Sequence, residues 1–175
     1  MQRIQLMATA LLPIMAVFCL FYVIFTGHDA LDLAILTPER WLDSRYADPQ
    51  VQIPQSTRIV AAFALLSPVI AGLVAVLMAI YVLNLVRQGV LFDERIARGF
   101  RVAGVATAVS GILGMAISWL RPTILSWHNQ GGALASDFFF HSDTAGLIVC
   151  GAMFWLVGWI MREAIQIARD NEGFI

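Results

Sequence analysis

Long apolar stretches alternate with charged segments along the sequence. Residues 4–27, 59–86, 102–120 and 144–161 contain no Asp, Glu, Lys, Arg or His. A helix needs about 20 apolar residues to cross the ~30 Å hydrocarbon core of a bilayer, and these stretches are close to that length or longer. An open strand does not span lipid, because its backbone groups would stay unpaired. The pattern therefore predicts an all-α polytopic membrane protein, with four transmembrane helices in a single bundle domain.

Two of the stretches, 4–27 and 59–86, have features that a simple membrane span does not explain. The first follows Arg3 and so begins like a signal peptide, but it is too long for one and no small-residue cleavage site follows it. We therefore expect a retained span. The stretch 59–86 is the longest, and we expect it to tilt, to kink at Pro68 or to emerge from the bilayer.

The segments between the spans indicate an orientation. Outer loops are expected at 28–58 and 121–143, and an inner hairpin at 87–101 and a tail at 162–175 share the other side with the N-terminus. All eleven basic residues are Arg, of which seven fall on the inner side (Arg3, Arg87, Arg95, Arg98, Arg101, Arg162, Arg169) and four on the outer side (Arg40, Arg45, Arg58, Arg121). Basic residues accumulate on the cytoplasmic side of membrane proteins. Both termini are therefore expected in the cytoplasm.

Composition agrees with a membrane protein and excludes some functions. The chain has 175 residues, 59% of them hydrophobic and 13% charged, whereas soluble domains carry roughly 25% charged residues. The formal net charge of −1 gives no overall basicity of the kind that binds nucleic acid. Cys19 and Cys150 both lie within apolar stretches and form no metal or redox spacing, so we expect two buried thiols.

Small residues predict where the helices approach one another. Helices in lipid associate through close packing, which small side chains allow. Stripes with a spacing of four occur in the second and third spans: Ala71, Ala75 and Ala79, and Ser110, Gly114 and Ser118. They fit packing inside one bundle or a seam between two copies of the chain, and the sequence leaves both open.

Asp, Glu, Lys, Arg and His are absent from all four spans, and this bears most directly on function. Buried charges in membrane proteins mark ion paths, proton relays and substrate sites. Pro13 and Pro68 interrupt two spans, but the paired Gly/Pro breaks of transporters are missing. We therefore expect neither a transporter nor an enzyme, and no cofactor.

The three histidines are the candidate ligands of a metal or haem site. His28, His128 and His141 all fall in the outer loops, near several aspartates. Such groups can bind a metal or haem. No HxxxH or HExxH spacing is present, so interfacial histidines without a ligand are the simpler interpretation.

The inner hairpin carries the clearest local signals. Gly89 is expected to end the second helix, and Asp93 to cap the next one. Arg95, Arg98 and Arg101 recur every three residues and so line one side of that helix. They can contact anionic lipid headgroups or receive an acidic protein partner, and both interpretations stay open.

The hairpin and the tail resemble a family. Gly89 to Asp93 reads Gly-x-x-Phe-Asp, Arg101 to Gly104 reads Arg-x-Ala-Gly, and the tail contains Arg162-Glu163-Ala164 and ends in Asp170-Asn171-Glu172-Gly173-Phe174-Ile175. These motifs are similar to those of a bacterial family of four-span membrane proteins catalogued as a domain of unknown function. The resemblance implies an inner-membrane location. It also implies a link to small helix-turn-helix regulators, and it supplies no catalytic residues.

Three functions follow as hypotheses. The first is a non-enzymatic regulator or sensor that couples the state of the envelope to a cytoplasmic partner. The second is an accessory subunit of a larger membrane complex. The third is a metal- or haem-binding membrane protein that uses the outer histidines.

Overall fold

Four long helices make up the part of the chain that the structure describes. The computed structural model describes residues 2–31, 54–127 and 142–172. Its helices are α1 (Gln2–Leu31), α3 (Gln55–Arg87), α4 (Glu94–Ser126) and α5 (Ser142–Glu172). All four are long and apolar enough to cross a membrane. The predicted all-α fold with four transmembrane helices is therefore confirmed.

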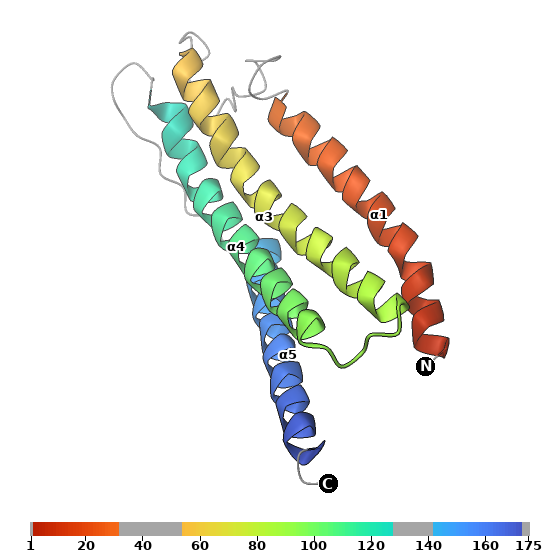
Figure 1. Ribbon diagram of the computed structural model, residues 1–175. Coiled ribbons are helices and arrows are strands. Elements are labelled where there is room, and N and C mark those ends of the chain that lie inside the picture. The colour runs from red at the N-terminus through yellow and green to blue at the C-terminus, as the bar shows by residue number, and fades with distance from the viewer. Residues whose placement is uncertain (1, 32–53, 128–141, 173–175) are drawn as a thin grey trace.

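The helices pack mainly with their neighbours in the sequence. The main contacts join α1 to α3, α3 to α4, and α4 to α5. Figure 1 shows α1 at one edge, beside α3, while α5 lies against the opposite side of α4. The bundle is therefore open, and α1 and α5 each leave much of their surface to lipid or to a partner. Leu6 and Phe18 of α1 and Met153 of α5 illustrate this, with exposed fractions of 70%, 59% and 62%.

One end of the bundle brings together the N-terminus, the turn between α3 and α4, and the C-terminal part of α5 (Figure 1). We call this the turn end. It agrees with the predicted arrangement, in which both termini and the inner hairpin share a side. The assignment of that side to the cytoplasm stays a prediction.

The helices extend beyond the predicted spans at both ends. The hairpin predicted at 87–101 is a short turn, because α3 ends at Arg87 and α4 begins at Glu94. The predicted tail is helical as far as Glu172, as an extension of the fourth span. Hydropathy marks only the residues inside lipid, whereas the helical hydrogen bonds continue into the polar residues on either side.

The turn has well-defined caps on both sides. The amide of Gly89 donates to the carbonyl of Val86 at 3.0 Å, and the amide of Val90 donates to that of Leu85 at 3.1 Å. This Schellman pattern needs a left-handed residue, and Gly89 supplies it with a φ of 84°. Asp93 then accepts a hydrogen bond from the amide of Arg95 at 2.7 Å and caps α4. Both predicted caps are confirmed.

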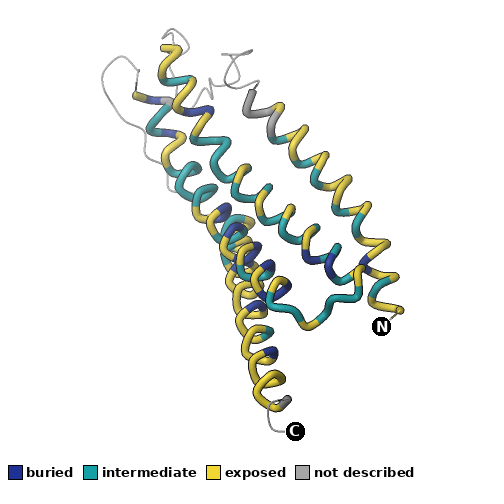
Figure 2. Tube along the Cα trace, in the orientation of Figure 1, coloured by how far each residue is buried: buried dark blue, intermediate teal, exposed yellow. Residues whose placement is uncertain are grey.

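The best-packed apolar cluster lies at the turn end. Val82, Leu85 and Ile96 are buried there, and Val86, Val90, Phe100 and Met161 pack around them. Figure 2 shows buried positions on α3 and α4 near this turn, with exposed positions dominating α1 and α5. The cluster joins residues of α3, α4 and α5, and so fixes the three helices where they leave the apolar region.

Close backbone contact holds α4 against α5. A Cβ atom added to Gly151 would lie 2.6 Å from the carbonyl oxygen of Gly104, and one added to Gly158 would lie 2.7 Å from that of Ala97. Neither backbone can yield easily, so only glycine fits at these positions. Gly111 makes a similar approach to the carbonyl of Thr144, at 2.8 Å.

Candidate functional site

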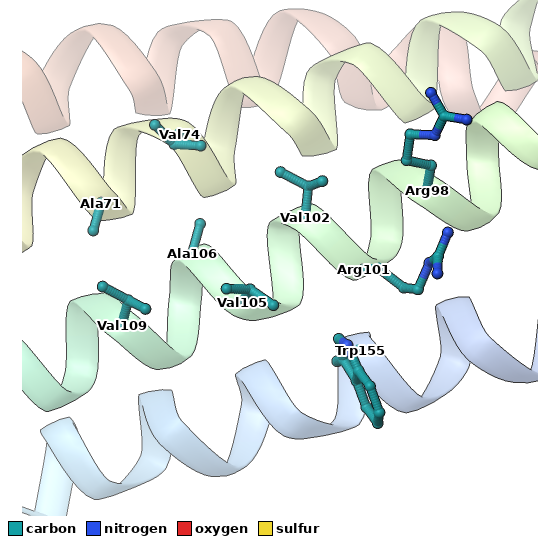
Figure 3. Close-up of a pocket in the computed structure, with 9 residues that line it drawn as sticks. All are labelled: Ala71, Val74, Arg98, Arg101, Val102, Val105, Ala106, Val109 and Trp155. Carbon is teal, nitrogen blue, oxygen red and sulfur yellow. The ribbon is translucent and has the colours of Figure 1, made fainter.

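A groove on the side of the bundle is the candidate site. It has a volume of about 560 Å³ and runs along α3 and α4, with one contribution from α5. We call it the Arg groove, and its lining residues are Ala71, Val74, Arg98, Arg101, Val102, Val105, Ala106, Val109 and Trp155. Figure 3 shows the two arginines at one end and the aliphatic side chains along the rest. The groove is therefore cationic at the turn end and apolar within the span.

The sequence explains this division. Arg98, Val102, Val105 and Val109 follow one another at intervals of three or four, which places them on one face of α4. Arg101 is the last charged residue before the apolar stretch 102–120. The face of α4 therefore changes from charged to apolar where the helix enters the bilayer.

Arg101 lies against α5, and part of its side chain is buried. Its side-chain stem lies close to Gly158, since a Cβ atom there would approach Arg101 Cγ to 2.8 Å. Its Nε is buried and has no hydrogen-bond partner among the described residues. A buried donor without an acceptor costs about 1–3 kcal/mol. No carboxylate among the described residues pairs with Arg101, so its charge is open to an anion from outside the chain.

Arg95 and Arg98 differ although both are exposed. Arg98 lines the groove. Arg95 does not, and its Nε lies 3.7 Å from Asp93 Oδ1 at the start of its own helix. Of the three arginines predicted to contact lipid or a partner, the structure brings two together.

The residues of the predicted stripe Ser110, Gly114 and Ser118 differ in what they contact. Ser110 Oγ donates to the carbonyl of Pro68 and so joins α4 to α3, whereas Ser118 Oγ donates to Met115 within its own helix. Gly114 lies at the contact with α5, where an added Cβ would approach Thr144 Cγ2 to 3.3 Å. The close α4–α5 contact at Gly104, Gly151 and Gly158 depends on glycines outside those stripes.

The alanine stripe lines open space. Ala71 lies in the Arg groove. Ala75 and Ala79 line a separate apolar cavity of about 370 Å³, to which all four helices contribute, among them Met15 of α1 and Phe154 of α5. Small side chains here leave a void between the helices, where a larger residue would fill it.

The structure describes one of the three histidines that the sequence offered as metal or haem ligands. His28 lies in the last turn of α1, and its side chain is exposed. His128 and His141 lie outside the described residues. Among residues 2–31, 54–127 and 142–172, no group of three His, Cys, Asp or Glu is arranged to hold a metal. Metal or haem binding by the three histidines stays a prediction.

Sequence reasoning missed one further site at the turn end. A small polar pocket of about 210 Å³ lies between the start of α4 and the extension of α5, lined by Glu94, Arg162, Ile165, Gln166, Arg169 and Asp170. Ile165 is 8% exposed. Ile165 is one of several apolar residues in a tail expected to be in water, and such residues were the signal for this contact.

Comparison with known proteins gives no match, whether with protein-family models, with curated proteins or with solved structures. The resemblance to a bacterial four-span family therefore stays a prediction from the hairpin and tail motifs.

Proposed function

We propose that this protein is a non-enzymatic membrane regulator whose turn end binds a soluble cytoplasmic partner. The observation that carries the proposal is the buried cluster of Val82, Leu85 and Ile96. It joins the last turn of α3, the first turn of α4 and, through Met161, the helix α5. A surface built on well-packed residues has little conformational freedom to lose when a partner binds.

The turn end also carries large exposed apolar side chains, which can anchor a binding partner. Phe92 is 81% exposed in the turn, and Ile167 is 60% exposed on the extension of α5. Large apolar side chains exposed to water mark interaction sites more often when polar residues surround them. Glu163 lies four residues before Ile167 and Asp170 three residues after it, so both polar residues share its side of the helix.

The extension of α5 offers the partner a binding surface outside the bilayer. From Arg162 to Glu172 the helix continues for about 16 Å, at 1.5 Å per residue. Figure 1 shows that this segment passes beyond the α3–α4 turn. A partner can therefore contact the helix clear of the lipid headgroups.

Site-specific photo-crosslinking tests this function. A photoreactive amino acid is placed at Phe92 or at Ile167 in the full chain, with Leu20 of α1, which is 60% exposed within a span, as the matched control. Crosslinks from Phe92 and Ile167 to one soluble protein, with none from Leu20, are the expected result. Crosslinks to lipid alone from all three positions would contradict the proposal.

An accessory role in a larger membrane complex is the second candidate. It is favoured by the exposed aromatic face of α5, where the rings of Trp155 and Trp159 stack with centroids 6.4 Å apart and remain 45% and 47% exposed. The same experiment separates the two functions, because a crosslinker at Trp159 would then capture another polytopic protein.

A further inference from the structure

We propose that the Arg groove binds one anionic phospholipid from the leaflet at the turn end. The phosphate would lie against Arg98 and Arg101, and an acyl chain would follow the aliphatic residues toward Val109. This inference is independent of the proposed function, because it concerns the side of the bundle and requires no soluble partner.

The charge at the turn end of the groove favours an anion. Both guanidinium groups line it, and none of its nine lining residues carries a carboxylate. Neither Arg98 nor Arg101 has an ion-pair partner among the described residues, whereas Arg95 lies near Asp93. Guanidinium groups bind phosphate oxygens through paired, charge-assisted hydrogen bonds.

The rest of the groove favours a hydrocarbon chain. Val102, Val105 and Val109 are 38%, 51% and 39% exposed along it. From Arg101 to Val109 the groove extends about 12 Å along α4, at 1.5 Å per residue. The volume of about 560 Å³ is within the range of pockets that hold small molecules. A ligand that fills the groove must therefore be charged at one end and apolar over most of its length.

Position in the bilayer selects a lipid over a soluble anion. The aliphatic part belongs to α3 and α4 within their candidate membrane spans. Arg101 comes immediately before the uncharged stretch 102–120, which places it at the level of the headgroups. A free phosphate would use only the arginines and leave the apolar part unfilled, whereas one phospholipid occupies both parts.

Native mass spectrometry of the full-length, delipidated protein tests the proposal. Phosphatidylglycerol and phosphatidylcholine with identical acyl chains are added at equal concentration, and the lipid-bound fractions are compared. We expect phosphatidylglycerol to bind at least about fivefold more tightly. The double variant R98Q/R101Q should lose that preference, since it removes the charge-assisted contacts.

Matched variants separate this site from general attraction to positive charge. Arg95→Gln removes a nearby charge from outside the groove and should leave the preference unchanged. Ala106→Trp fills the apolar part, where Ala106 is buried, and should weaken the binding of both lipids. Equal binding of the two lipids by the unaltered protein would overturn the proposal. So would an equal loss of preference in R95Q and R98Q/R101Q.

A soluble headgroup distinguishes the two sources of phosphate. Glycerol phosphate at the concentration of the lipid should not displace phosphatidylglycerol, because it lacks the acyl chain. Displacement, together with unaltered lipid binding by A106W, would show a phosphate site only and would overturn the lipid assignment. Arg98→Gln alone provides the same test if the double variant does not fold, because Arg98 is exposed.

Discussion

The hydroxyl of Ser110 on α4 donates a 2.8 Å hydrogen bond to the carbonyl oxygen of Pro68 on α3. Pro68 lies inside α3, where its ring nitrogen provides no hydrogen for the carbonyl four residues earlier, that of Ala64. Ser67 Oγ donates to that carbonyl at 2.7 Å. Two serines therefore supply hydrogen bonds on either side of a proline, and one of them joins two helices.

Replacing Ser110 with alanine should destabilise the protein by about 0.6–2 kcal/mol, the usual range for a hydrogen bond between membrane helices. Ser118→Ala is the matched control, because among the described residues Ser118 Oγ bonds to Met115 of its own helix, so a smaller effect is expected. Unfolding in SDS–detergent mixtures, followed by circular dichroism, measures both. Equal effects of the two substitutions would mean that the contact with Pro68 adds nothing between the helices.

The Gly104–Gly151 contact predicts a second effect. A methyl group on Gly151 would meet the carbonyl of Gly104 at 2.6 Å and so push α4 and α5 apart. Gly151→Ala should therefore destabilise the protein by about 1–3 kcal/mol, as overpacking does elsewhere. Gly146→Ala on the same helix is the control, because an added Cβ there meets nothing within 4 Å.

The same unfolding assay decides the outcome for these glycines. Gly146→Ala should be neutral or slightly stabilising, because alanine has the higher helix propensity. If Gly151→Ala proved as harmless as Gly146→Ala, the helices would have to separate at little cost, and the close contact would not be what joins them.

The sequence predicted the helices well because lipid imposes a simple rule. A span must be apolar and long, so four uncharged stretches indicate four helices. The turn was predictable for a similar reason, since only glycine adopts the conformation of Gly89 easily and Asp93 is a good cap. Both signals are local in the sequence.

Packing between helices was harder to predict, because it depends on how each helix is rotated. Ala75 and Ala79 have the spacing of a helix contact but line a cavity, whereas the close contact uses Gly151 and Gly158, seven residues apart. Many faces of an apolar helix carry small residues. The Arg groove was partly visible, because Arg98 and Val102 share a face of α4, but its second wall comes from Ala71 and Val74 of α3.

The cap at Asp93 gives a third prediction. Asp93→Ala removes the side-chain acceptor for the amide of Arg95, and the loss of such a cap costs about 1 kcal/mol. Asp93→Asn keeps an acceptor at that position and should cost much less. Hydrogen exchange of the amides in the first turn of α4 checks the mechanism, because only the alanine variant should exchange faster there.

Topology gives the last prediction. Gln5 of α1 lies near the turn, since a Cβ atom on Gly89 would approach its Nε2 to 2.9 Å, and Figure 1 places the C-terminal part of α5 at the same end. Single cysteines at Gln5, Phe92 and Ile167 should therefore all react with a membrane-impermeant maleimide from the same side. The excess of Arg predicts the cytoplasmic side, so labelling of all three should require opened cells or inverted vesicles. The two native cysteines are replaced by serine for this experiment. Labelling of all three in intact cells would reverse the orientation but keep the fold, whereas labelling from different sides would contradict the arrangement of the helices itself.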